Sequence, residues 1–165
     1  MPFEIHPEVP KEGKKVSDLF VGVSVENMFG NISHMGKKYG INFCGADFIS
    51  NSRMALLASE YAKDKGKFHD FHSKIFYMYF AEGKNIADKD VLSSIAGSIG
   101  LNSEEMFNKI EEGTYENHLK EAQKIARNFN VNSTPTFIID GKHVLVGAQP
   151  IEKFKEVLNN KVIKF

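Results

Sequence analysis

The sequence predicts an α/β fold in which both ends of the chain form a small sheet and helices occupy the middle. Pro135 stands directly before the apolar run 136–139, and because proline has no N–H to give to a sheet, it must precede the strand. Asp140-Gly141 and a second apolar run, 144–146, follow, which predicts a tight turn and a second strand. Residues 3–5 alternate apolar and polar side chains, which predicts a short strand at the start of the chain. The predicted sheet therefore has three strands.

Apolar side chains at helical spacing, preceded by capping residues, predict the helices. The capping residues are short and polar, and such side chains accept hydrogen bonds from the free N–H groups of a first turn. They are Ser24, Asn51, Asp88, Asn102 and Thr114. The predicted helices cover residues 24–39, 51–66, 67–81, 88–100, 104–112, 115–129 and 151–158. Segment 67–81 is apolar around much of its girth, so we expect it to be largely buried.

Composition and charge argue against several classes of protein. Lys plus Arg and Asp plus Glu both number 21, so the formal net charge is zero, which disfavours a nucleic-acid-binding or membrane-surface protein. No apolar run approaches the ~18–20 residues of a transmembrane helix, and no signal peptide leads the chain. We therefore expect a cytoplasmic protein.

The chain contains a single cysteine, Cys44. One cysteine cannot form an internal disulfide, a C-x-x-C redox pair or a cysteine-based zinc site. Cys44 lies in a segment predicted to be irregular, and no neighbouring residue gives it a motif. We therefore interpret it as a small, half-buried residue or an incidental thiol.

His69 and His72 form the one pattern that resembles a metal site, with Asp70 beside them. A metal site needs a third ligand and usually a fourth, and the pattern His-Asp-Phe-His differs from His-Glu-x-x-His. We interpret both as surface histidines beside a buried helix face, and we predict no metal and no cofactor. The glycines show no phosphate-loop or dinucleotide spacing, which disfavours nucleotide binding.

The residues around the Thr134–Pro135 peptide bond leave two interpretations of its isomer open. They fit a trans proline that starts an edge strand, or a cis proline that turns the Thr134 backbone outward. The proline-strand-hairpin-helix ending resembles the C-terminal half of the thioredoxin fold, in which this bond is cis. Four further segments resemble the FrnE branch of the DsbA-like thiol–disulfide oxidoreductases. They are residues 3–13, residues 51–52, Tyr-Phe-Ala-Glu-Gly within 79–88, and Gly-Ala-Gln-Pro at 147–150. The resemblance covers nearly the whole chain and implies the cis isomer.

The resemblance also implies how the chain is divided. It assigns residues 1–40 and 114–165 to a thioredoxin-like part and residues 41–113 to an inserted all-helical domain. In the family, a strand, a C-x-x-C motif and a helix precede the segment that matches residues 2–4, and this sequence starts at that segment. We therefore expect an incomplete sheet without its first strand-helix unit, and unpaired strand edges that favour a homo-oligomer.

The function implied by the resemblance is that of a DsbA-family thiol–disulfide oxidoreductase. Ser133, Thr134 and Pro135 would face a protein or peptide thiol or disulfide substrate. Such an enzyme needs a reactive thiolate and a second, resolving cysteine, so we expect this chain to have no catalytic residue and to be inactive alone. Two alternatives stay open: a non-catalytic module that binds peptides or a partner through the cis-proline groove, and a glutathione-using isomerase or transferase of the same superfamily. Glutathione is accordingly a second candidate partner.

Overall fold

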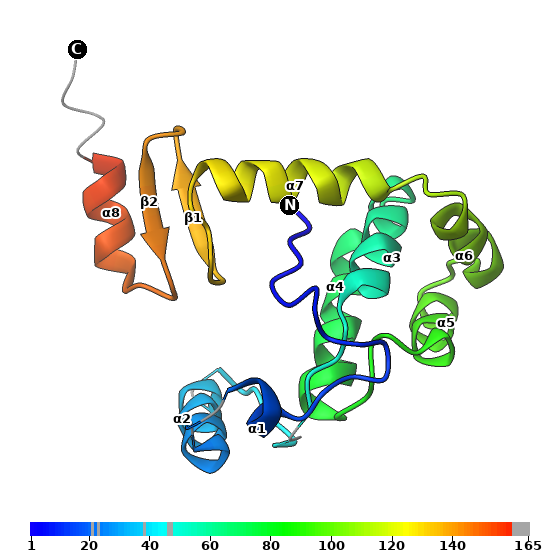
Figure 1. Cartoon of the computed structure of the whole chain (residues 1–165), viewed down its shortest axis with the longest axis horizontal. Coiled ribbons are helices and arrows are strands. Elements are labelled where there is room, and N and C mark those ends of the chain that lie inside the picture. Colours follow the sequence, from blue (N-terminus) through cyan, green and yellow to red (C-terminus); the bar gives the residue numbers. More distant parts are fainter. Residues whose placement is uncertain (21, 23, 38, 46–47, 160–165) are drawn as a thin grey trace. The chain divides into compact units, whose positions relative to one another are not determined.

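The computed structural model describes the whole chain except residues 21, 23, 38, 46–47 and 160–165 (Figure 1). The chain forms two compact units, Met1–Lys120 (unit 1) and Glu121–Phe165 (unit 2). These units are defined by compactness, so the predicted insertion at 41–113 stays a prediction. Among the described residues, no helix is both long enough and apolar enough to cross a membrane.

Unit 1 is helical. Its elements are α1 (Val16–Leu19), α2 (Val25–Lys37), α3 (Arg53–Asp64), α4 (Phe68–Phe76), the π-helix η1 (Tyr77–Ala81), α5 (Lys89–Ser98), α6 (Ser103–Glu111) and the first residues of α7 (Glu116–Asn128). The predicted helices are therefore present, with boundaries that differ by a few residues. Residues 41–45 are irregular, as predicted.

The predicted caps explain where the helices begin. The side chains of Asp88 and Asn102 accept hydrogen bonds from the N–H groups of Asp90 and Glu105, both at 2.9 Å. At its other end α5 stops before Gly100, whose φ of 76° lies in the left-handed region that favours glycine. Local sequence is sufficient to fix these boundaries.

One hydrophobic core joins the helices from α3 to the start of α7. α3 packs against α4 and α6, and α5 packs against the same two helices (Figure 1). The largest core side chains that are fully buried come from these helices and from α7: Tyr61, Phe71, Leu92, Met106 and Leu119. Burial of each such side chain contributes roughly 1.5–3 kcal/mol, so this core is the main source of stability in unit 1.

The predicted helix 67–81 differs from expectation in two ways. It ends in the π-helix η1, and much of its apolar surface is exposed. Phe71 and Ile75 face the core, whereas Phe76 and Tyr77 are 50% and 59% exposed. The prediction of a largely buried helix is wrong here because one face packs on α3 and α5, whereas Phe76 and Tyr77 lie outside that contact and are exposed.

Unit 2 contains the remainder of α7, a hairpin and a second helix. β1 (Thr136–Ile139) pairs antiparallel with β2 (His143–Val146), in the register that places Phe137 opposite Leu145. The turn residues Asp140 and Gly141 have φ values of 50° and 65°, as a tight turn between twisted strands requires. Helix α8 (Ile151–Asn159) packs Phe154 against Phe137, with ring centroids 4.9 Å apart.

The predicted strand at residues 3–5 is wrong. Among the described residues the sheet contains β1 and β2 alone, and the opening segment is irregular. Alternation placed Glu4 on the outer face, yet Glu4 is 6% exposed because its carboxylate accepts a hydrogen bond from Arg53 Nη1 at 2.9 Å. An ion pair with a residue far along the chain decides the conformation here, and short-range alternation cannot reveal it.

Candidate functional site

The loop Ser133–Pro135 leads into β1 and is fixed on both sides. The Thr134–Pro135 peptide bond is cis, the isomer that the resemblance implies. The hydroxyl of Thr136 donates to the Ser133 carbonyl at 2.7 Å. The Pro135 carbonyl accepts from the Gly147 N–H, also at 2.7 Å. The hairpin therefore holds the three predicted substrate-facing residues together as one surface loop.

Thr134 is the residue of this loop that is open to a partner. Its side chain is exposed. Within the part of the chain that the structure describes, neither its backbone N–H nor its C=O has a hydrogen-bond partner. Free backbone groups next to a strand can pair with an extended peptide, because each N–H and C=O needs a partner. The free backbone groups of the loop are thus suited to pairing with an extended chain, and the loop contains no thiol.

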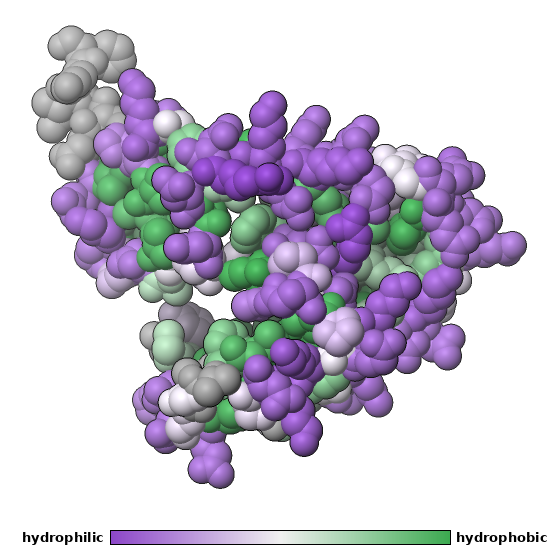
Figure 2. All heavy atoms as spheres, viewed as in Figure 1, coloured by the Kyte–Doolittle hydropathy of each residue, from purple (hydrophilic) through white to green (hydrophobic). Residues whose placement is uncertain are grey.

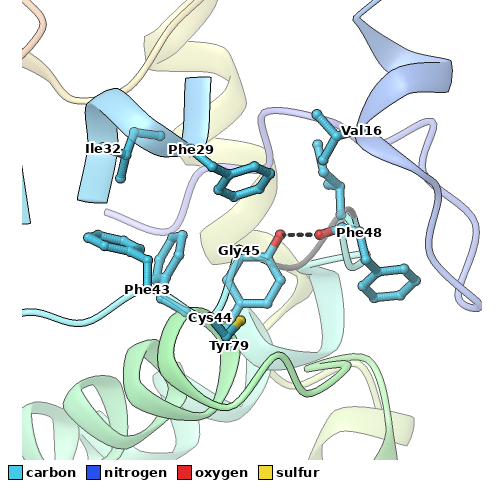
Figure 3. Close-up of a pocket in the computed structure, with 10 residues that line it drawn as sticks. Val16, Phe29, Ile32, Phe43, Cys44, Gly45, Phe48 and Tyr79 are labelled. Atoms are coloured by element: carbon cyan, nitrogen blue, oxygen red, sulfur yellow. Dashed lines mark hydrogen bonds between the residues drawn. The ribbon is translucent and has the colours of Figure 1, made fainter. Parts of the chain in front are cut away.

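Cys44 is exposed, so of the two interpretations the half-buried residue is wrong and the incidental thiol stays a prediction. Its backbone N–H donates to the Phe80 carbonyl at 2.8 Å, which ties the irregular segment 41–45 to the π-helix η1. The thiol lies in the lining of an apolar hollow in unit 1 (Figure 3). No other cysteine exists in the chain to complete a disulfide with it.

His69 and His72 are both exposed, as predicted. The His72 ring lies between two aromatic rings, with centroids 5.1 Å from Phe68 and 4.6 Å from Phe76. Burial against these rings, with a further contribution from His69, lowers the pKa of His72. Across the described residues, no three His, Cys, Asp or Glu side chains are placed to hold a metal ion.

Sequence reasoning missed a buried polar contact between α3 and the start of α7. Glu60 is 4% exposed, and its carboxylate lies 2.6 Å from Nδ1 of His118. Arg53 makes a second contact of this kind, because it pairs with Glu116 as well as with Glu4. Glu60 and His118 are 58 residues apart in the sequence, and Arg53 and Glu116 are 63 apart, so no local sequence pattern predicts these pairs. These contacts attach α7 to α3 and are structural in character.

Comparison with known proteins identifies the family. The family model for the DSBA-like thioredoxin domain matches residues 1–159, so the chain belongs to this family. The chain is 29% identical over 165 residues to the uncharacterized protein YwbO of Bacillus subtilis (strain 168), which covers 98% of this chain and 80% of YwbO. Its fold is similar to the crystal structure of the probable DsbA oxidoreductase SCO1869 from Streptomyces coelicolor, with a TM-score of 0.83 and 21% identity over 96% of this chain and 72% of that chain.

These matches confirm the predicted kinship with DsbA-like proteins and the thioredoxin-like α/β fold. The fold is mostly helical, with a small two-stranded sheet in the described part of the chain. The FrnE branch and the absence of a first strand-helix unit stay predictions.

Proposed function

We propose that this chain acts as the polypeptide-binding part of a DsbA-family thiol–disulfide oxidoreductase system. It holds a protein or peptide thiol or disulfide against Ser133–Pro135, and it does not complete disulfide exchange by itself. Kinship with DsbA-like proteins supports the substrate class. The observation that carries the proposal is the exposed backbone of Thr134, whose N–H and C=O have no partner among the described residues.

The number of thiols supports the second half of this proposal. Exchange that releases the substrate and restores the enzyme proceeds through a mixed disulfide, which a second thiol resolves. This chain has one cysteine, Cys44. A second thiol must therefore come from outside these 165 residues, with glutathione as the small-molecule candidate. We further propose a cytoplasmic location, since reducing compartments are where such free thiols persist.

Binding is tested with backbone and side-chain variants of Thr134. The probe is a fluorescein-labelled, unstructured dodecapeptide whose central cysteine carries a methyl disulfide. Thr134→Pro removes the N–H and is expected to weaken binding by roughly three- to tenfold, the contribution of one hydrogen bond. Thr134→Ala keeps the N–H and is expected to bind within about twofold of the unchanged protein. Equal affinity of all three proteins would exclude pairing with the Thr134 backbone.

Activity is tested separately by glutathione-dependent reduction of insulin. The unchanged chain is expected to give the same rate as Cys44→Ser, and the same rate as glutathione alone. A rate that exceeds glutathione alone and disappears in Cys44→Ser would contradict inactivity and would favour a glutathione-using enzyme of the superfamily.

We also propose that the hairpin mediates self-association. β1 and β2 each pair on one side alone among the described strands. Val144 and Val146, 40% and 50% exposed, make the hairpin apolar as well. Edges of this kind are templates for another chain. Val144→Lys is expected to shift a dimer towards monomer in analytical ultracentrifugation, whereas a monomeric unchanged protein would refute the idea.

A further inference from the structure

We propose that an apolar groove on unit 1, defined by Ile32, Phe43, Phe76 and Phe80, binds an uncharged, extended segment of a polypeptide. The groove is made entirely by residues of unit 1. The proposal therefore stands independently of the loop Ser133–Pro135 and of disulfide exchange.

Two adjoining hollows form this groove. One has a volume of about 150 Å³ and includes Val16, Phe48 and Tyr79 in its lining, and the other has a volume of about 610 Å³ and includes Ile41 and Tyr77. Ile32, Phe43 and Phe80 line both, so the hollows meet along these three side chains. In the smaller one, Phe29 and Ile32 reach in from α2, opposite Phe43 and Tyr79 (Figure 3).

A row of aromatic rings forms one wall of the groove. The ring centroids of Phe43 and Phe80 are 5.6 Å apart, and those of Phe80 and Phe76 are 5.5 Å apart. Phe76 is 50% exposed and Ile32 is 37% exposed. Apolar surface is visible beside α1 and α2 in Figure 2. A contiguous exposed patch of this type is unusual unless it binds something, because leaving it in water costs free energy.

The charge of the lining restricts what can bind. Among the residues that the structure describes, no Asp, Glu, Lys or Arg lines either hollow. The polar hydroxyls are already engaged, since Tyr79 donates to the Phe48 carbonyl at 3.3 Å and Tyr77 donates to Glu82 at 2.9 Å. A separate hollow beside α4 contains Glu60 and Lys63 and differs in this respect. A charged ligand would lose its hydration here without gaining a partner, so the occupant carries uncharged, apolar groups.

Backbone groups of two residues that line the larger hollow favour a polypeptide over a compact small molecule as the ligand. The irregular segment 41–45 is anchored by two bonds, from the Ile41 N–H to Gly36 and from the Cys44 N–H to Phe80. The N–H and C=O groups of Asn42 and Phe43 lack backbone partners within the described chain. An extended peptide satisfies such groups with its own main chain and places alternate side chains in pockets. Hollows beside free backbone groups fit that mode of recognition.

The single thiol gives a direct test on the unchanged protein. The probe is a cysteine-free decapeptide in which Phe or Leu alternates with Ser. Because Cys44 lines the groove and is the one cysteine, saturating probe is expected to slow its alkylation by N-ethylmaleimide by about fivefold or more. A peptide with Lys and Glu in place of Phe and Leu, and one N-methylated at alternate residues, are expected to protect poorly. Equal protection by all three peptides would overturn the proposal.

Variants locate the site on the groove. Phe76→Ser and Ile32→Ser remove exposed lining side chains and are expected to weaken binding of the fluorescein-labelled probe about tenfold. Met35→Ser is the matched control, because Met35 lies on α2 and is 57% exposed but lines neither hollow. Protection of Cys44 from alkylation separates the groove from the loop Ser133–Pro135, because Cys44 lines the groove and the loop lines neither hollow.

Two results would overturn the assignment of a polypeptide ligand. The first is loss of binding in Met35→Ser equal to that in Phe76→Ser. The second is a dimer of the unchanged protein that dissociates in Ile32→Ser, because the occupant of the groove would then be a second copy of this chain.

Discussion

The two compact units differ in how they use apolar side chains. Unit 1 buries large aromatic and aliphatic residues between its helices, with Phe71 and Leu92 fully inaccessible. Among the described residues of unit 2, the buried apolar side chains are Ala122, Ala126 and Leu145. Five of its larger apolar residues are exposed, namely Phe137, Val144, Val146, Ile151 and Leu158, and the other described ones apart from Leu145 are half-buried. Stability is therefore concentrated in unit 1, whereas unit 2 presents apolar surface and free strand edges that other chains can use.

The largest expected effect breaks the core of unit 1. Phe71→Ala removes a ring that is 0% exposed and is expected to lower the free energy of unfolding by about 3–5 kcal/mol in urea denaturation. Phe137→Ala in unit 2, where the ring is 38% exposed, is the matched control and is expected to cost about 1–2 kcal/mol. Equal losses would show that the two units contribute alike to stability.

The next effect concerns the ion pairs of Arg53. Arg53→Met leaves the nearly inaccessible Glu4 carboxylate without its cation, which is expected to cost about 2–3 kcal/mol. Glu116→Gln keeps Arg53 paired with Glu4 and is expected to cost less than about 1 kcal/mol, since Glu116 is partly exposed. Thermal unfolding of both variants measures the difference. A reversed order would assign the stabilisation to Glu116.

Two glycines of α2 offer a smaller and sharper comparison. A Cβ at position 36 would lie 2.6 Å from the Phe43 ring and 3.0 Å from the Ile41 carbonyl, whereas a Cβ at position 30 would contact nothing within 4 Å. Gly36→Ala is therefore expected to destabilise unit 1 by about 1–2 kcal/mol. Gly30→Ala is expected to stabilise it by up to about 1 kcal/mol, because alanine favours helix. Chemical denaturation measures the free energy of unfolding of both variants. A stabilising Gly36→Ala would show that the segment around Phe43 moves aside at little cost.

The smallest effect appears only in alkali. Burial, together with the hydrogen bond to Glu105, raises the pKa of Tyr61 to about 12 from 10.0. Burial raises the pKa of Tyr115 likewise, to about 12. Folding thus favours the protonated phenols, so their contribution is complete below pH 10 and is lost as the pH rises towards 12. Absorbance at 295 nm measures phenolate formation, and Tyr61→Phe should remove one late-titrating group. Titration of every tyrosine near pH 10 would contradict this.

Local features of the fold could be predicted from the sequence, and features set by distant partners could not. Asp88, Asn102 and the turn Asp140-Gly141 act on N–H groups or φ angles within a few residues, so their effects are visible in sequence. The failed strand at residues 3–5 depends on Glu4 meeting Arg53, 49 residues away. Only the tertiary structure contains that information.

The same distinction applies to the candidate sites. The cis bond before Pro135 and the hairpin after it could be predicted, the first from the family resemblance and the second from local sequence, whereas the substrate-facing role of Ser133, Thr134 and Pro135 stays a prediction. The groove could not be predicted from the sequence, because it joins Phe43 to Phe80 across 37 positions. The exposure of Phe76 likewise depends on which face of its helix is covered in the folded chain. Aromatic residues at helical spacing predict a buried helix face, and the sequence alone cannot show that some of these side chains are exposed to solvent.

Gly13 gives the groove one further property. Its φ is 83°, and a Cβ built there would collide with the Phe48 ring and approach the Ile49 carbonyl at 2.9 Å. The ring of Phe48, which lines the smaller hollow, thus rests on bare main chain. In a saturation-mutagenesis library, position 13 would accept no replacement while its neighbours vary, so the most constrained point of this surface would be a residue with no side chain at all.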